Sequence, residues 1–176
     1  MMKLFLLFLL VVGVNASTFS LQTGEVRAHT EVFGDSTIDP KSTKINSVLL
    51  MSEKIESLKG SISLNAMTLV SDNLDRDEHM YEALEVKEHT HIAFHINSLV
   101  KKDKNYILLG TFVLNGTQHE ISSVAIIKQE NNSLSLEGSF SIKMSDFNIK
   151  PPTMLFLTVR DRVDITYSLK YKEEKE

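Results

Sequence analysis

The sequence predicts an all-β domain of eight antiparallel strands with one helix. Along most of the chain apolar and polar residues alternate with a period of two, which is typical of strands buried on one face. A single stretch, residues 71–86, instead follows the period of an amphipathic helix. Turn-forming residues separate the alternating runs, and Asn115-Gly116 is the strongest hairpin signal among them.

Three strands are expected before the helix, at residues 25–34, 44–51 and 61–69. In the first, Val26, Ala28 and Thr30 share one side. The helix should fill the connection between the third and fourth strands, because residues 71–73 offer N-cap side chains and acidic residues follow. Its apolar side is formed by Leu74, Met80, Tyr81 and Leu84. That side needs a partner, which a sheet face or the mouth of a barrel would provide.

Five more strands are expected at residues 90–98, 106–114, 120–128, 133–144 and 162–171. Eight strands fit a closed barrel, which removes exposed edges and has an interior just wide enough for side chains or one small ligand. A sandwich of two sheets is the alternative, and periodicity does not decide between them. The loop Ser145–Met154 contains Pro151-Pro152 and carries more apolar surface than a solvated connection needs. We therefore expect this loop to cover something.

The first sixteen residues have the composition of a secretory signal peptide. Lys3 supplies a positive region, an apolar run follows it, and Val14-Asn15-Ala16 is a small-residue cleavage site. The apolar run is too short to span a bilayer. We expect cleavage after Ala16, which leaves residues 17–176 as one exported, soluble domain in the periplasm or outside the cell.

Composition excludes several classes of function. The chain has no cysteine, so its stability must come from its core alone. Removal of Lys3 with the signal peptide changes the formal net charge from −4 to −5, and a mildly acidic surface argues against nucleic acid and against electrostatic docking to anionic lipid headgroups. No nucleophile elbow or phosphate-cradling glycine loop occurs. We therefore expect no enzyme activity and no cofactor.

A metal site would need three or four converging ligands. His89, His91 and His95 share one strand face, opposite Ile92 and Phe94. Because the apolar face should point inward, we expect the histidines to face solvent and to bind no metal.

Three blocks resemble the YceI-like family of polyisoprenoid-binding, lipocalin-like proteins. They are residues 76–80 (RDEHM), residues 106–117 (YILLGTFVLNGT), and residues 144–149 (MSDFNI) followed by Val163-Asp164-Ile165. Many members open with an Asp-x-x-His-Ser element, whereas Thr23-Gly24-Glu25-Val26 stands there in this chain. The sequence therefore leaves open the register of the first strand and any ligand contact from that strand.

The resemblance implies an extended lipocalin-like barrel with an elongated apolar cavity. Family members are exported bacterial proteins that hold long-chain amphiphiles such as isoprenoid quinones, polyprenyl phosphates or fatty amides, and some pair as homodimers. The sequence favours a cavity independently, because Met51, Met67, Met80, Met144 and Met154 lie among leucine and phenylalanine, and methionine adapts to irregular apolar shapes. The alternative is that these methionines fill a solid core.

Candidate ligand-binding residues follow from this reasoning. The cavity mouth is assigned to Met80, Tyr81, Leu84, Phe147, Met154 and Phe156, and the interior to Phe94, Phe112 and Phe140. Met67 is a further candidate with no assigned position. Each could instead belong to ordinary core packing. Arg76 or Arg160 could offer a forked guanidinium to a headgroup, and Arg76 could instead form a surface or helix ion pair.

The sequence thus predicts a non-enzymatic, exported binding protein that shields a long lipid tail from water. An enzyme acting on such a lipid, or an envelope interaction protein with a filled core, are the alternatives. Stable insertion into the membrane is not expected.

Overall fold

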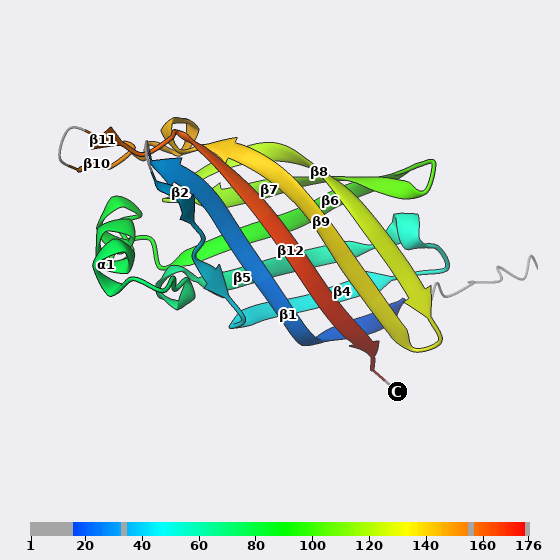
Figure 1. Cartoon of the computed structure of the whole chain (residues 1–176). Helices are drawn as coiled ribbons and strands as arrows, with labels where there is room; N and C mark the ends of the chain where they lie inside the picture. Colours follow the sequence, from blue (N-terminus) through cyan, green and yellow to red (C-terminus); the bar gives the residue numbers. More distant parts are fainter. Residues whose placement is uncertain (1–15, 33–34, 155–156, 175–176) are drawn as a thin grey trace, which may run out of the picture.

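Eight strands form a closed antiparallel barrel (Figure 1). The structure is a computed structural model that describes residues 16–32, 35–154 and 157–174, with the backbone alone at 35–37 and 154. The barrel strands are β1 (Ser17–Val32), β4 (Ile45–Met51), β5 (Lys59–Asn65), β6 (His91–Lys102), β7 (Asn105–Leu114), β8 (Thr117–Glu130), β9 (Ser133–Lys143) and β12 (Arg162–Glu173). Each pairs with the next, and β12 returns to pair with β1 from Phe19↔Glu173 to His29↔Asp164. This pairing confirms the barrel and excludes the sandwich.

Strand β1 begins eight residues earlier than the sequence predicted. Its pairing with β12 shifts register between Leu21 and Thr23, so one extra residue, Gln22, bulges from the ladder. The bulge changes which positions face inward: Phe19 is fully buried before it, whereas Val26 and Ala28 face inward after it. A strict period of two cannot cross such a bulge, which is why the pattern revealed only the second half of the strand.

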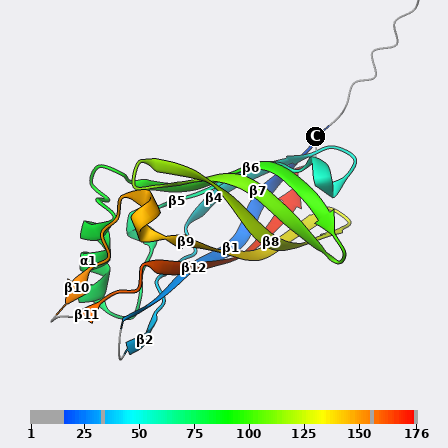
Figure 2. The same cartoon turned by 90° about the horizontal axis from the view of Figure 1, so that it is seen from above.

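The helix lies between the third and fourth barrel strands, as predicted. Helix α1 (Leu74–Ala83) is capped by Asn73, whose side chain accepts a hydrogen bond from the Arg76 amide at 3.1 Å. It covers one end of the barrel (Figures 1 and 2). Leu74 does not belong to its inner side, because this side chain is 80% exposed. No helix that the described residues form has both the length and the apolar character needed to cross a membrane.

Short elements extend the barrel at the α1 end. Strands β2 (Asp35–Ile38) and β3 (Lys41–Ser42) pair with β1, and β10 (Thr153–Met154) pairs with β11 (Leu157–Thr158). The 3-10 turns η2 (Ala66–Thr68) and η3 (Met144–Phe147) follow β5 and β9. The loop after β9 covers the barrel, as expected, since Phe147 and Ile149 are 1% and 2% exposed.

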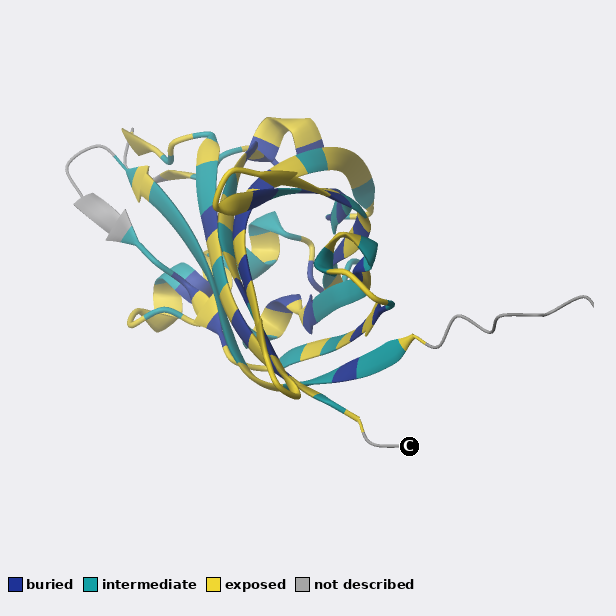
Figure 3. Ribbon diagram, turned by 90° about the vertical axis from the view of Figure 1, so that its right-hand side faces the viewer, coloured by how far each residue is buried: buried dark blue, intermediate teal, exposed yellow. Residues whose placement is uncertain are grey.

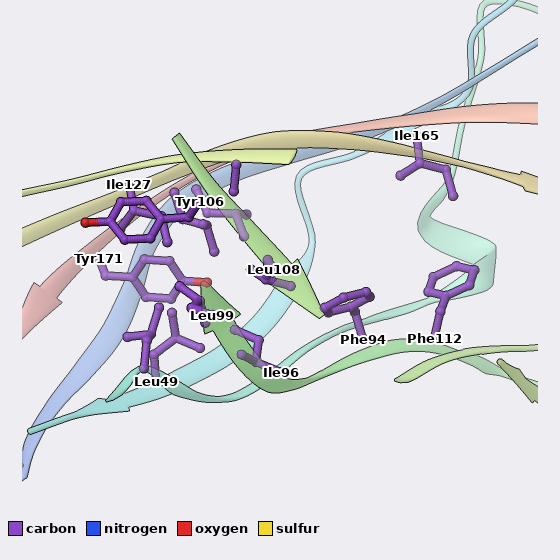
Figure 4. Close-up of a cluster of buried hydrophobic side chains, with 14 of the residues drawn as sticks. Leu49, Phe94, Ile96, Leu99, Tyr106, Leu108, Phe112, Ile127, Ile165 and Tyr171 are labelled. Carbon is purple, nitrogen blue, oxygen red and sulfur yellow. The ribbon is translucent and has the colours of Figure 1, made fainter. Parts of the chain in front are cut away.

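The opposite end of the barrel is filled with side chains. The 3-10 turn η1 (Ile55–Ser57) lies there, and Leu49, Leu99 and Tyr106 surround the ring of Tyr171 (Figure 4). Along the strands buried and exposed residues alternate, so one face of each points into the barrel (Figure 3). The Tyr171 hydroxyl is satisfied by Ser47 at 2.9 Å, and burial raises the pKa of this tyrosine. The barrel is therefore solid at one end and covered by α1 at the other.

Candidate functional site

An apolar cavity of about 400 Å³ occupies the α1 end of the barrel. Of the 26 residues that line it, 21 are apolar or proline, so the space favours a hydrocarbon over a polar ligand. The apolar lining residues are Val26, Ala28, Val32, Ile38, Pro40, Leu64, Leu69, Met80, Ala83, Leu84, Ile92, Phe112, Leu114, Ile142, Met144, Ile149, Pro152, Leu157, Val159, Val163 and Ile165.

Three groups of elements form the walls. Strand β1 contributes Val26 and Ala28 because the bulge at Gln22 turns these positions inward. Strands β9 and β12 contribute the facing pair Ile142 and Val163, which are register partners. Helix α1 closes the space with Met80 and Ala83 from its inner side, together with its C-cap residue Leu84. The cavity is therefore bounded by residues far apart in the sequence.

Aromatic rings form the floor of the cavity. Phe112 lines the large cavity and also a smaller void of about 50 Å³ deeper in the barrel, which Phe94 and Phe140 line as well. The Phe140 ring centroid lies 5.7 Å from that of Phe94 and 5.3 Å from that of Phe112, distances typical of favourable aromatic pairs. These three rings separate the open cavity from the filled end.

The polar part of the lining consists of Thr30, Ser71, Arg76, Asp77 and His79. Asp77 is only 4% exposed, and both of its carboxylate oxygens accept from the Ser71 amide, at 2.9 and 3.0 Å. This carboxylate therefore anchors the start of α1 to the chain before it. Arg76 and His79 add N–H groups to the same wall, so donors for a ligand headgroup are concentrated at the helix.

The candidate ligand-binding residues lie in different parts of the barrel. Arg76, Met80, Leu84 and Phe112 line the large cavity, and Phe94 and Phe140 line the void beneath it. Of the five methionines, Met80 and Met144 line the cavity and Met51 is buried in the filled end.

Three candidates lie elsewhere, and two more fall outside the described side chains. Met67 is 57% exposed and is not in the lining. The Tyr81 hydroxyl donates to the Leu69 carbonyl at 2.7 Å and also bonds the Met67 carbonyl, so it fixes the chain before α1. Phe147 packs behind Phe112, with ring centroids 5.6 Å apart. Phe156 and the side chain of Met154 lie outside the described residues.

Several lining residues were not among the candidates. Val26, Ala28, Val163 and Ile165 line the cavity, and each alternates with polar neighbours along its strand. Alternation shows that a residue points into a barrel, but it does not show at which height the barrel is empty. Alternation therefore gives the side of the strand on which these residues lie, but not their place in the cavity wall.

Among the described residues, three side chains of the kinds that bind metal ions lie close together. The ligand atoms of Glu85, Glu88 and His89 lie within 4.8 Å of one another, and both glutamates are exposed. His91 and His95 are exposed on the outer face of β6, in agreement with their expected direction.

An ion pair attaches the β2–β3 segment to β1 beside the cavity. His29 Nδ1 lies 2.6 Å from Asp39 Oδ1, and His29 Nε2 lies 3.5 Å from Glu31 Oε1. Asp39 precedes Pro40, whose ring lines the cavity and whose carbonyl accepts from the Ala28 amide at 2.9 Å. The hydrogen bond to Asp39 raises the pKa of His29 above its ordinary value of 6.5.

We expect this pair to make stability depend on pH. Because the folded pKa of His29 is raised, its stabilising contribution is complete below pH 6.5 and is lost as the pH rises through the raised value. Urea unfolding between mildly acidic and alkaline pH measures this loss. Asp39→Asn should remove that part of the pH dependence, and an unchanged pH profile in this variant would show that the pair contributes no stability.

The fold and the cavity define a class of protein: a closed antiparallel barrel with an apolar interior that lies beneath a helix. The sequence identifies the family within that class, because the YceI-like domain matches residues 12–171. The chain therefore belongs to the YceI-like family, and the resemblance seen in its three sequence blocks is confirmed.

Solved structures share this fold at low sequence identity. Burkholderia cenocepacia BcnA superposes with a TM-score of 0.75 at 14% identity, over 84% of this chain and 95% of that chain. A polyisoprenoid binding domain from Saccharophagus degradans, implicated in plant cell wall breakdown, gives 0.70 at 9% identity, over 92% and 100%. The Campylobacter jejuni YCEI protein gives 0.61 at 14% identity, over 99% and 92%. At these identities the likeness establishes the fold alone.

Proposed function

We propose that this protein is an exported, non-enzymatic binding protein that holds the tail of a long-chain amphiphile inside its barrel. The observation that carries this proposal is the cavity of about 400 Å³ with 21 apolar residues in its wall. Its volume lies within the roughly 300–1,000 Å³ range of ligand pockets. The ligand classes that fit are an isoprenoid quinone, a polyprenyl phosphate or a fatty amide, held for transport, storage or sequestration.

Apolar burial supplies enough free energy for such binding. Each methylene transferred from water contributes about 0.8 kcal/mol, so ten buried carbons contribute about 8 kcal/mol. This is comparable with the roughly 4–15 kcal/mol lost on association through reduced freedom of motion. A tail of more than ten carbons therefore offsets a cost in the lower half of that range without strong polar contacts, and selectivity rests on the length and shape of the tail.

The polar wall at α1 is suited to the headgroup. Arg76 presents a planar guanidinium with several donors, which suits a phosphate or a carbonyl oxygen. Asp77 accepts hydrogen bonds from the Ser71 amide. Its carboxylate disfavours a second anion close to it. The arrangement favours a headgroup that accepts hydrogen bonds from Arg76 and His79.

Two further observations support export and lipid binding. The apolar N-terminal run, which falls on residues outside the described part of the chain, has the pattern of a signal peptide and fits a periplasmic or secreted protein. A neighbour with the same fold is described as a polyisoprenoid binding domain.

Native mass spectrometry of the mature protein, purified from its own cell envelope without detergent, tests the proposal. We expect a stoichiometric adduct that organic extraction releases as a single class of long-chain lipid. A bare protein mass, together with no uptake of added quinone, polyprenyl phosphate or fatty amide, would contradict lipid binding. The measured mass also reports cleavage after Ala16 and the presence of any homodimer.

A further inference from the structure

The volume of the cavity limits how much of a tail can enter. An apolar protein cavity of about 150 Å³ holds one benzene molecule, which corresponds to about 25 Å³ per carbon. At that density the cavity of about 400 Å³ holds roughly sixteen carbons. The deeper void of about 50 Å³ would add roughly two carbons if it became connected.

Two glycines leave space in the sheet that is occupied by aromatic side chains at the closed end of the cavity. A Cβ atom at Gly110 would lie 2.3 Å from the Phe94 ring, so this ring rests where any other residue would place its side chain. A Cβ at Gly138 would likewise lie 2.3 Å from the Tyr167 hydroxyl. Rings that rest on glycine in neighbouring strands are fixed by contact on that side. Phe94 and Tyr167 cannot withdraw toward the sheet to lengthen the cavity.

A buried hydrogen bond holds Tyr167 from its other end. Its hydroxyl lies 2.8 Å from Ser123 Oγ, which is fully buried and donates to the Ser139 carbonyl at 3.0 Å. Burial raises the pKa of Tyr167 to about 12. This ring and Phe140 both line the small void beneath the floor. Movement of Tyr167 would leave buried hydroxyl groups unpaired, which is unfavourable.

Apart from the small void, little room remains beneath these rings, because fully buried side chains fill the barrel there. Leu49, Leu136 and Leu169 are each 0% exposed, and Tyr171 is 2% exposed. Interiors packed in this way resist the insertion of additional atoms. A tail that enters at the α1 end therefore stops at the three phenylalanine rings.

Resting on the proposed function, we infer that the cavity holds one hydrocarbon tail of about sixteen carbons, and that Phe94, Phe112 and Phe140 set this length. A single fatty-acyl chain or three isoprene units satisfies the limit. A polyprenyl chain of eight or more units is at least about twice too long, so most of it would remain in water. Of the lipid classes that suit the apolar lining, those with a single tail of medium length therefore fit the cavity.

The test is a chain-length series with the wild-type protein. Competition against a fluorescent acyl probe gives the dissociation constants of saturated fatty amides of about 10 to 24 carbons, and of prenyl phosphates of about 3 to 11 isoprene units. We expect the affinity to rise about fourfold per methylene up to about sixteen carbons, because each added carbon is buried. Beyond that length the affinity should stay constant, because added carbons remain outside.

Phe140→Ala tests the floor directly. Removing the ring frees space for about six carbons and connects the deeper void, so the length at which affinity stops rising should increase by at least that number. Leu136→Ala is the matched control, because it deletes a buried side chain in the filled end and lines neither space. Its limiting length should equal that of the wild type.

The outcomes separate this inference from the function on which it rests. Affinity that continues to rise through the longest prenyl phosphates would overturn the length limit and leave lipid binding intact. A limit that Phe140→Ala does not move would show that the rings do not set it. Absence of binding at every length would overturn the proposed function itself.

Discussion

Replacing Ala28 with tryptophan should abolish lipid binding while the barrel remains folded. Ala28 lies on β1 and its methyl group lines the cavity, so an indole at this position would point into the space. Its nine ring atoms would occupy more than half of the 400 Å³ at about 25 Å³ each. The burial of about nine tail carbons is then lost, which corresponds to about 7 kcal/mol, or an affinity decrease of about 10⁵-fold.

Displacement of a fluorescent acyl probe measures this loss. Val124→Trp is the matched control, because Val124 is 50% exposed on the outer face of β8 and the same residue there should leave affinity unchanged. A cooperative thermal transition in Ala28→Trp shows that the variant is folded, and the backbone bond from the Ala28 amide to Pro40 can persist. Binding within about tenfold of the wild type would mean that the tail occupies another site.

Phe147→Ala should cause the largest loss of stability among substitutions near the cavity. The ring is 1% exposed and packs edge-on against Phe112 at 5.6 Å and His119 at 4.9 Å. Truncating a buried phenylalanine costs about 3–5 kcal/mol, because burial is lost and a cavity remains. We expect the free energy of unfolding to fall by about this amount.

Urea unfolding followed by circular dichroism measures the difference. Leu74→Ala on α1 is the control, since a side chain that is 80% exposed should change stability by no more than about 0.5 kcal/mol. The sequence suggested that Phe147 contacts the ligand at the mouth. A stability loss below about 1 kcal/mol combined with a large loss of affinity would support that contact instead of a core role.

Local pattern was sufficient for most of the fold. Alternation located the eight barrel strands, and the change of period near residue 71 located the helix between the third and fourth of them. The turn at Asn115-Gly116 was also predictable, because both residues adopt positive φ angles, 49° and 67°, that few other pairs tolerate. Each of these features depends on interactions between residues close in sequence, so the sequence determined them.

Closure and the position of the empty space depended on tertiary structure. The pairing of β1 with β12 joins residues such as Phe19 and Glu173, and no local pattern distinguishes this pairing from a sandwich. The bulge at Gln22 interrupted the alternation and hid the first half of β1.

The candidate site shows the same division. Phe112 and Phe147 are both buried aromatic residues, yet Phe112 lines the cavity and Phe147 lies behind it. The sequence by itself determined the strands with one apolar face, the helix between the third and fourth of them, and membership of the YceI-like family. Only the tertiary structure decided which inward-facing residues surround empty space, because that depends on how rings from distant strands meet across the barrel.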